Sequence, residues 1–373
     1  MNAELRVLIV SPDFPPDSGG VQILMARLAE HLPDAVVRVV TFDAPGAPAF
    51  DREAGLDVRR VRRFGGTPKL RIAALAARAL AEARNFDCDV VLVAHVAAFP
   101  VGALIRRLLD IPWVLYVHAD EFRVWPRACA HAVRRADAVI AVSNHSAGLA
   151  RSSGVAPERL HVILNGVDAA PAAPAESSAA RRPTVLTVAR MVDRYKGHDL
   201  MLRAIPLVAA RVPDVRWVVV GDGPLRASCQ TQAVALGIQE HVSFEGNVSD
   251  FDRDRWLDSA DVFAMPARLP PGGLGGEGFG IVFLEAAAHG LPVVAGAEGG
   301  AVDAVDDGRT GVLVDPHDHL ALADALTDLL TDQGRSLAMG QAGREWAARF
   351  SWPSRGAELA AVLRSVTATT ATG

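Results

Sequence analysis

The sequence predicts an α/β protein with two Rossmann-like, doubly wound parallel sheets that face a cleft. Two observations carry this prediction. Short runs of β-branched residues alternate with alanine-rich helical patterns along most of the chain. Such alternation indicates parallel sheets covered by helices on both faces. The alternation stops at a segment rich in Ala, Pro and Ser, 169–183, and then restarts, as in two domains joined by a linker.

The length of the chain supports the same division. A chain of 373 residues exceeds the size at which one core is typical. We expect an N-terminal domain over 1–168, a linker over 169–183 and a second domain over 184–351. The amphipathic pattern of Trp352–Val366 predicts that the remaining segment, 352–373, is helical.

Apolar runs and helical periodicity place the elements in order. The strands predicted for the first half are Arg6–Val10, Val36–Thr41, Val90–Ala94, Trp113–Val117 and Ala138–Val142. The helices predicted between them include Gln22–Leu32, Leu70–Arg84 and Val101–Leu109. The strands predicted for the second half are Thr184–Val188, Trp217–Val220, Val242–Phe244, Val262–Met265, Pro292–Ala295 and Val312–Val314. Ligands of such sheets bind beyond the carboxyl ends of the strands.

Composition narrows the class of protein. Half of the residues are hydrophobic and 22% are charged, which is typical of a globular protein. The net charge of −5 gives no sign of general nucleic-acid binding. Cys88, Cys129 and Cys229 fit neither a metal site nor a disulfide framework, which favours a reducing cytoplasm. The first apolar run, Val7–Val10, is too short for a signal peptide or a membrane span.

The most informative stretch is the glycine-rich segment 272–290, which leads into a short helix that ends near Gly290. Glycines let the backbone approach a ligand closely, and the start of a helix binds phosphate through its free N–H groups. Glu277 in the loop and Glu285 on the helix frame that start, and carboxylates accept hydrogen bonds from sugar hydroxyls. By itself, the segment is equally consistent with an ordinary loop-to-helix turn.

Cations follow the first strand of the second half. Arg190 and Lys196 stand where a ligand is expected, and Arg can grip a phosphate while Lys adds a point charge. A solvated basic loop is the commoner alternative, and we expect Arg194 to face water in this way. In the first half, Gly19 and Gly20 precede a helix and are able to bring backbone amides to a phosphate, or simply to cap that helix.

His118 lies just past an apolar strand of the first half, where it either binds a sugar hydroxyl or handles a proton, or serves structure alone. The basic cluster around Arg59–Arg71 suits an anionic acceptor or lipid headgroup. The preferred alternative is a solvated face balanced by nearby acids. Two D-x-D spacings, Asp87–Asp89 and Asp252–Asp254, offer too few oxygen ligands for a hard metal.

Taken together, these residues resemble the family-4 retaining glycosyltransferases, which have the GT-B architecture. The resemblance covers nearly the whole chain. It is carried by the Gly19-Gly20 loop, His118, Ala141–Asn144, Ile163–Asp168, Arg190 with Lys196, Gly221-Asp-Gly, and an E-x7-E element in which seven residues separate Glu277 from Glu285. Arg190 and Lys196 are six apart where many relatives have five, and Asp303 stands where relatives often carry Glu.

The resemblance implies a role at each matching position. Arg190 and Lys196 would bind the donor diphosphate, and Glu277 would contact the transferred sugar. Backbone amides of Phe279, Gly280 and Ile281 would hold sugar hydroxyls or phosphate. Glu285 would bind the ribose hydroxyls. His118 would meet the sugar from the N-terminal domain, Gly19 and Gly20 would close on the diphosphate, and the last helix would cross back to that domain.

The expected reaction moves a hexose from a UDP- or GDP-sugar to an acceptor hydroxyl with retention, with no metal, no further cofactor and no nucleic-acid partner. The sequence does not identify the sugar, the nucleoside or the acceptor. It also does not decide whether the basic segment Arg59–Arg71 contacts a membrane surface. Two alternatives remain: a sugar-nucleotide 2-epimerase of the same architecture, and a non-catalytic nucleotide-sugar-binding protein. An NAD-dependent oxidoreductase is disfavoured because no G-x-G-x-x-G follows the first strand.

Overall fold

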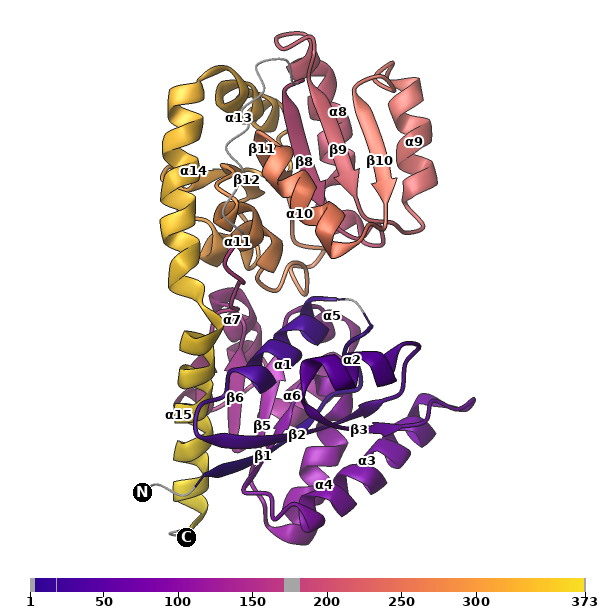
Figure 1. The fold of residues 1–373 in the computed structure, drawn as a ribbon, viewed down its shortest axis with the longest axis vertical. Coiled ribbons are helices and arrows are strands. Elements are labelled where there is room, and N and C mark those ends of the chain that lie inside the picture. The colour runs from indigo at the N-terminus through magenta and orange to yellow at the C-terminus, as the bar shows by residue number, and fades with distance from the viewer. Residues whose placement is uncertain (1–3, 18, 171–181, 372–373) are drawn as a thin grey trace. The chain divides into compact units, whose positions relative to one another are not determined.

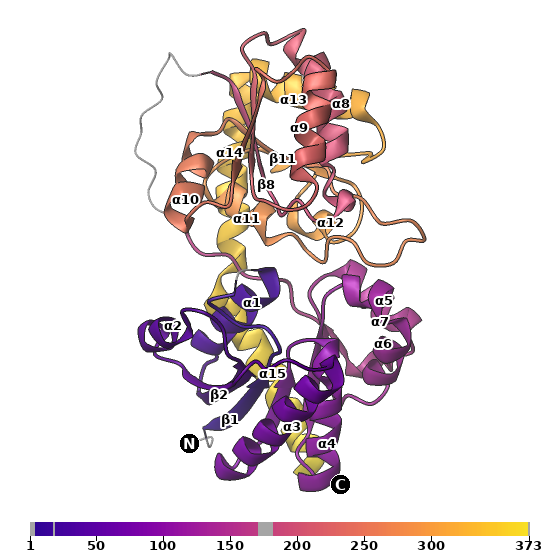
Figure 2. The same cartoon turned by 90° about the vertical axis from the view of Figure 1, so that its right-hand side faces the viewer.

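The structure is a computed structural model that describes residues 4–17, 19–170 and 182–371. The chain divides into two compact units, each drawn in Figures 1 and 2. The first unit comprises Met1–Gly166 and Trp352–Gly373, and the second comprises Val167–Ser351. Most of the predicted linker, 169–183, lies outside the described residues.

The first unit is built on a seven-stranded parallel sheet in the order β3-β2-β1-β4-β5-β6-β7. The bounds of the strands are β1 Leu5–Val10, β2 Ala35–Phe42, β3 Asp57–Val61, β4 Val90–Val93, β5 Trp113–Val117, β6 Ala138–Ala141 and β7 Leu160–Val162. Strands β4, β5 and β6 are buried throughout, and β1 is buried except at Arg6, because a parallel sheet is covered on both faces.

Helices cover both faces of this sheet. Their bounds are α1 Gly20–Glu30, α2 Ala47–Ala54, α3 Pro68–Asn85, α4 Phe99–Leu109, α5 Asp120–Val124, α6 Pro126–Val133, α7 Asn144–Ser152 and α15 Trp352–Ala371, with short 3₁₀ turns η1 Val96–Ala98 and η2 Pro157–Arg159. Helices α3 and α4 pack against each other and on β1 to β5, whereas α15 packs on α1 and β4. Gly356 of α15 lets the helix approach the end of α1, since a Cβ there would lie 2.0 Å from the carbonyl oxygen of His31.

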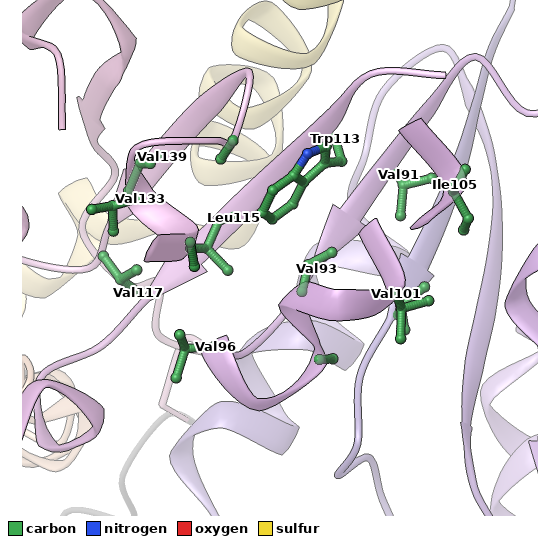
Figure 3. Close-up of a cluster of buried hydrophobic side chains, with 14 of the residues drawn as sticks. Val91, Val93, Val96, Val101, Ile105, Trp113, Leu115, Val117, Val133 and Val139 are labelled. Carbon is green, nitrogen blue, oxygen red and sulfur yellow. The ribbon is translucent and has the colours of Figure 1, made fainter. Parts of the chain in front are cut away.

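Figure 3 shows how alternate residues of two neighbouring strands build the core under α4. Val91 of β4 lies beside Ile105 of α4, and Leu115 lies farther along β5 near Val133 of α6 (Figure 3). All three, and Trp113 between them, are at most 1% exposed. Burying each such side chain stabilises the fold by roughly 1.5–3 kcal/mol. Gly102 lets α4 approach closely, because a Cβ there would lie 2.7 Å from the ring of Trp113.

The second unit has a six-stranded parallel sheet in the order β10-β9-β8-β11-β12-β13. Its strands are β8 Thr184–Val188, β9 Arg216–Val220, β10 Val242–Gly246, β11 Val262–Met265, β12 Val293–Gly296 and β13 Gly311–Val314. Its helices are α8 His198–Ala209, α9 Arg226–Ala235, α10 Asp250–Ser259, α11 Ile281–Ala288, α12 Ala301–Ala304, α13 His319–Thr331 and α14 Gln333–Ala347, with 3₁₀ turns η3 Arg194–Lys196 and η4 Ala348–Phe350.

Both sheets reverse their strand order once, between β1 and β4 in the first unit and between β8 and β11 in the second. This topology confirms the predicted fold of two Rossmann-like parallel sheets, and every strand predicted from the sequence is present. The sequence interpretation missed β3 and β7. Ligands of open α/β sheets bind at the carboxyl ends of the strands beside such a switch point, so the loops after β1, β4, β8 and β11 are where a site is expected.

Candidate active site

The loop after β8 presents Arg190 at the switch point of the second sheet. The N–H of Met191 donates to the carbonyl of Asp222, and the N–H of Leu225 donates to the carbonyl of Met191, both at 2.9 Å. Gly221 makes this contact possible, because a Cβ there would lie 2.1 Å from the carbonyl oxygen of Ala189. The Gly221-Asp-Gly motif therefore holds the backbone on both sides of Arg190.

The side chain of Arg190 is exposed. It makes no hydrogen bond or ion pair with any residue that the structure describes. An unpaired guanidinium fixed by its backbone is ready to bind an anion with two parallel hydrogen bonds. Arg194 is also exposed, as predicted, but it lies in η3 rather than at the strand end.

Lys196 reaches a carboxylate from another loop. Its Nζ donates to Oε2 of Glu277, and the two side chains are only 15% and 14% exposed. Gly197 places Lys196 here: its φ is 82°, and a Cβ would lie 2.3 Å from the carbonyl oxygen of Pro266 after β11. Lys196 and Glu277, which the sequence analysis named as separate site residues, are thus in contact across the switch point.

The loop after β12 supports the backbone that carries Glu277. The N–H of Gly300 donates to the carbonyl of Glu277 at 2.8 Å, and a Cβ at Gly300 would lie 2.1 Å from the carbonyl oxygen of Gly278. Oε2 of Glu298 accepts a hydrogen bond from the N–H of Leu269 at 2.6 Å. The sequence analysis named Asp303 downstream of this supporting loop, residues 297–300, but not the supporting contacts, because they depend on β11 and β12 being adjacent.

The glycine-rich segment enters α11 as predicted. Gly280 precedes the helix with a φ of 87°, in the left-handed region that glycine adopts without strain. The first two N–H groups of α11, those of Ile281 and Val282, have no intrahelical partner and no side-chain cap, whereas the N–H of Phe283 donates to the carbonyl of Gly280 at 3.0 Å. Phe279 is buried against Phe350, so only its backbone is offered to a ligand at this helix start.

Glu285 sits on α11 next to a cation that the sequence interpretation missed. Oε1 of Glu285 lies 4.0 Å from Nη1 of Arg253 on α10, and Arg253 is held in turn by Asp250 and Asp254 at 3.1 and 3.2 Å. Burial raises the pKa of Glu285, while the charge of Arg253 opposes that rise. Asp250 and Asp254 therefore pair with Arg253, which in turn lies next to Glu285.

His118, Gly19 and Gly20 belong to the first unit. The Nε2–H of His118 donates to the carbonyl of Ala94 at 2.9 Å, and its backbone N–H donates to Oε1 of Glu121 at 2.6 Å. Glu121 is 4% exposed and fixes the turn after β5. Gly19 caps α1 with an extended backbone, and α1 starts at Gly20 without a side-chain cap.

The basic cluster has two parts with different roles. In the first part, the arginines are balanced by nearby acids. Arg59 pairs with Asp57, and Arg60, with only 10% of its side chain exposed, pairs with Asp51. Arg60 also donates to the carbonyl of Pro15 at 2.6 Å and so supports the loop after β1. These arginines belong to β3, which explains why the strand was read as a charged surface segment.

The remaining members of the cluster stay at the surface. Arg62, Lys69 and Arg71 are exposed, next to Phe64 and Leu70 with exposures of 42% and 57%. None of the described helices is both long enough and apolar enough to span a bilayer. Within residues 4–17, 19–170 and 182–371, no three His, Cys, Asp or Glu side chains gather as they would around a metal ion.

Comparison with known proteins agrees with this arrangement. Residues 18–171 match Glycosyltransferase Family 4, and residues 172–346 match Glycosyl transferases group 1. A Mycolicibacterium smegmatis protein named GDP-mannose-dependent alpha-(1-6)-phosphatidylinositol monomannoside mannosyltransferase is 37% identical, with 96% of this chain and 98% of that protein aligned.

Two further comparisons cover almost the whole chain. A Corynebacterium glutamicum protein named GDP-mannose-dependent monoacylated alpha-(1-6)-phosphatidylinositol monomannoside mannosyltransferase is 32% identical over 98% of this chain and 99% of its own length. The crystal structure of Anabaena HepE in complex with UDP and glucose superposes with a TM-score of 0.81 at 23% identity, covering 97% of this chain and all of that one.

The fold and these family matches thus define a glycosyltransferase of GT-B architecture that uses a nucleotide-sugar donor. The chain belongs to glycosyltransferase family 4.

Proposed function

We propose that this glycosyltransferase moves a hexose, with retention and without a metal ion, from a nucleoside diphosphate sugar to an acceptor hydroxyl. The observation that carries the proposal is the ion pair of Lys196 with Glu277, just before α11, at the switch point where Arg190 follows β8. Two cations and free backbone N–H groups suit a diphosphate, and the carboxylate of Glu277 suits a sugar hydroxyl.

In this proposal, Arg190, Lys196 and the N–H groups at Ile281 stabilise the charge that grows on the leaving diphosphate. Preorganised contacts of this kind are typically worth about 3 kcal/mol each in the transition state. The two protein cations supply the charge that a metal ion would otherwise provide. The acceptor attacks from the face that the diphosphate leaves, which gives retention, and no residue is assigned as a covalent nucleophile.

The remaining residues take supporting roles. Glu285 binds the ribose hydroxyls, with the charge of Arg253 opposing the rise of its pKa that burial causes, and the amides of Phe279 and Gly280 contribute beside that of Ile281. From the first unit, His118 meets the transferred sugar, and Gly19 and Gly20 bring backbone amides to the diphosphate. The first unit is then the acceptor-side domain and the second unit is the nucleotide-sugar domain.

The donor we propose is GDP-mannose. The relatives that match over nearly their whole length at 32–37% identity carry GDP-mannose in their names. The structure solved with UDP and glucose is 23% identical and supports the fold alone. The acceptor we propose is an inositol-containing lipid of the kind those names describe.

Donor choice is tested by incubating the enzyme with GDP-mannose, GDP-fucose, UDP-glucose and UDP-N-acetylglucosamine, each with and without phosphatidylinositol monomannoside in vesicles. Release of GDP that depends on the acceptor, and that persists in EDTA, is the expected result. Transfer from a UDP-sugar at the higher rate, or loss of activity in EDTA, would contradict the proposal. NMR of the product distinguishes the retained from the inverted linkage.

A lipid acceptor requires contact with a membrane, and we propose that the exposed residues Arg62, Phe64, Lys69, Leu70 and Arg71 provide it on the cytoplasmic face. Cations near an anionic surface are worth about 1 kcal/mol each. The triple variant Arg62→Glu, Lys69→Glu, Arg71→Glu should lose sedimentation with anionic vesicles but keep GDP affinity. Equal sedimentation of variant and wild type would refute this contact.

A further inference from the structure

The first sheet also has a switch point, and the residue at it has no role in the reaction described above. The strand order reverses between β1 and β4, and His95 follows β4 directly. His118 follows β5, the next strand in the sheet. Because ligands of open α/β sheets bind beyond the strand ends at the switch point, the topology singles out His95 as much as His118.

The hydrogen bonds of His95 determine which of its nitrogens carries a proton. The backbone N–H of Ala97 donates to Nδ1 of His95 at 3.1 Å, so Nδ1 is the acceptor. Burial lowers the pKa of His95, against a smaller opposing effect of the Glu121 charge. The ring is therefore neutral near pH 7, and its proton resides on Nε2, which is left as a donor.

His118 has the opposite arrangement. Its Nε2–H donates to the carbonyl of Ala94, so its Nδ1 is left as an acceptor. The two rings are 6.1 Å apart and inclined by 19°. Among the residues that the structure describes, neither Nε2 of His95 nor Nδ1 of His118 has a hydrogen-bond partner, and neither is a fully buried polar atom. Side by side, they offer one donor and one acceptor.

An aromatic side chain stands beside this pair. The ring of Trp125 lies 5.6 Å from that of His95 at an angle of 84°, and Trp125 is 45% exposed. An exposed indole provides a rigid apolar surface with a polar N–H at its edge. On the other side of the switch point, the carboxylate of Asp13 is close enough to act on His95 electrostatically, and its side chain is 59% exposed.

We propose that His95 and Trp125 form the subsite that selects the acceptor, and that this subsite takes a polyhydroxylated six-membered ring, a sugar or a cyclitol. Nε2 of His95 donates to one ring hydroxyl, and the indole of Trp125 covers the C–H groups of the ring. A hydroxyl both donates and accepts, so a ring hydroxyl of the acceptor can accept from Nε2 of His95 while Nδ1 of His118 is left for the transferred sugar. The expected effect on transfer to the acceptor rests on the proposed function. Binding of the ring to His95 and Trp125 does not depend on it.

The cap that His95 makes on Ala97 is a structural role that must be separated from ligand binding. His95→Asn does this, because the Asn side-chain oxygen can accept from the N–H of Ala97 while the Nε2 donor is lost. The matched control is His131→Asn, which changes an exposed histidine of α6 in the same unit. Equal melting temperatures of the two variants and the wild type show that the cap is intact.

The kinetic experiment compares these variants and Trp125→Ala with phosphatidylinositol monomannoside in vesicles as acceptor and GDP-mannose as donor. Losing one hydrogen bond to the acceptor should raise its KM by roughly five- to tenfold. The KM for GDP-mannose and its acceptor-free hydrolysis should stay unchanged. If both His95→Asn and Trp125→Ala kept the acceptor KM of the wild type, the proposal would be overturned. If the wild-type enzyme transferred from a donor other than GDP-mannose, only the proposed function would be contradicted.

A binding experiment tests the same subsite without any turnover. The protein contains 11 histidines, and ring-labelled histidine gives each a separate NMR signal, with that of His95 assigned by its loss in His95→Asn. Adding methyl α-mannopyranoside or myo-inositol should shift the His95 signal, and adding propane-1,2-diol should not. An unmoved His95 signal with both rings, or an equal shift with the acyclic diol, would overturn the assignment.

Discussion

Gly300→Ala tests whether the supporting loop after β12 determines the position of Glu277. The φ of Gly300 is −78°, so alanine fits the backbone and only contacts decide the outcome. The new Cβ would lie 2.1 Å from the carbonyl oxygen of Gly278, where ordinary contact begins at 3.4 Å. The segment next to Glu277 must therefore move by about 1.3 Å, the difference between those two distances, because the obstacle is backbone and not a flexible side chain.

A displacement of this size has two measurable effects. Overpacking costs about 1–3 kcal/mol of unfolding free energy, and a misplacement of roughly 1 Å in a catalytic group can cost about 100-fold in rate. We expect the kcat for GDP-mannose to fall far more than the loss of folded protein, judged from the change in melting temperature, can explain. The KM should change less than kcat, because the backbone beside Arg190 is held by Asp222 and Leu225, which lie outside the moved segment.

The matched control is Gly334→Ala in α14 of the same unit. A Cβ there meets nothing closer than Oδ1 of Asp332 at 3.5 Å, and alanine is a better helix former than glycine. Turnover of this control should equal that of the wild type. If Gly300→Ala matched the control in both turnover and melting temperature, the loop would not position Glu277 and the reasoning from close backbone contacts would be refuted.

Three further perturbations address individual side chains. In Arg253→Met, the pKa of Glu285 should rise further, because the charge of Arg253 no longer opposes the effect of burial. Calorimetry across a pH series should then show that GDP affinity is lost at a higher pH than in the wild type. Loss of GDP affinity at the same pH in both proteins would contradict the pairing. Burial lowers the pKa of His198 to about 4, so between pH 6.5 and 4 the unfolded chain binds a proton that the folded chain does not. The free energy of unfolding should therefore fall as the pH drops through this range, by up to roughly 3 kcal/mol. Urea unfolding of His198→Leu should show a flatter pH dependence, and the same pH dependence as in the wild type would contradict this. His118→Ala should impair transfer much more than GDP binding, and a large loss of GDP affinity by calorimetry would assign His118 a different role.

The fold was predictable where burial leaves a simple pattern. Strands such as Val90–Val93 and Trp113–Val117 are buried on both faces, so continuous apolar runs mark them. The edge-side strand β3, Asp57–Val61, is only half buried and contains two arginines and an aspartate. Its charges are satisfied by Asp51 and Asp57, a pairing that depends on contacts across elements and leaves no periodic signal in the sequence.

The candidate site divides in the same way. Arg190 and Lys196 were predictable because they follow a recognisable strand, and parallel strands bring their carboxyl ends together. Arg253 was not, because its relation to Glu285 depends on how α10 and α11 pack on the sheet. Glu298 was missed for a similar reason: its hydrogen bond to the N–H of Leu269 joins residues 29 apart in the chain, on loops that become neighbours only when β11 pairs with β12.

The central claim is that Arg190 and Lys196 hold the diphosphate of the donor, and calorimetry with GDP tests it most directly. Arg190→Ala and Lys196→Ala each remove a charge-assisted contact worth about 1.5–3 kcal/mol, so the affinity for GDP should fall by roughly 10- to 100-fold. Arg194→Ala, which removes an exposed cation from the same loop, should bind GDP like the wild type. Wild-type affinity in all three variants, or an equal loss in all three, would contradict the account.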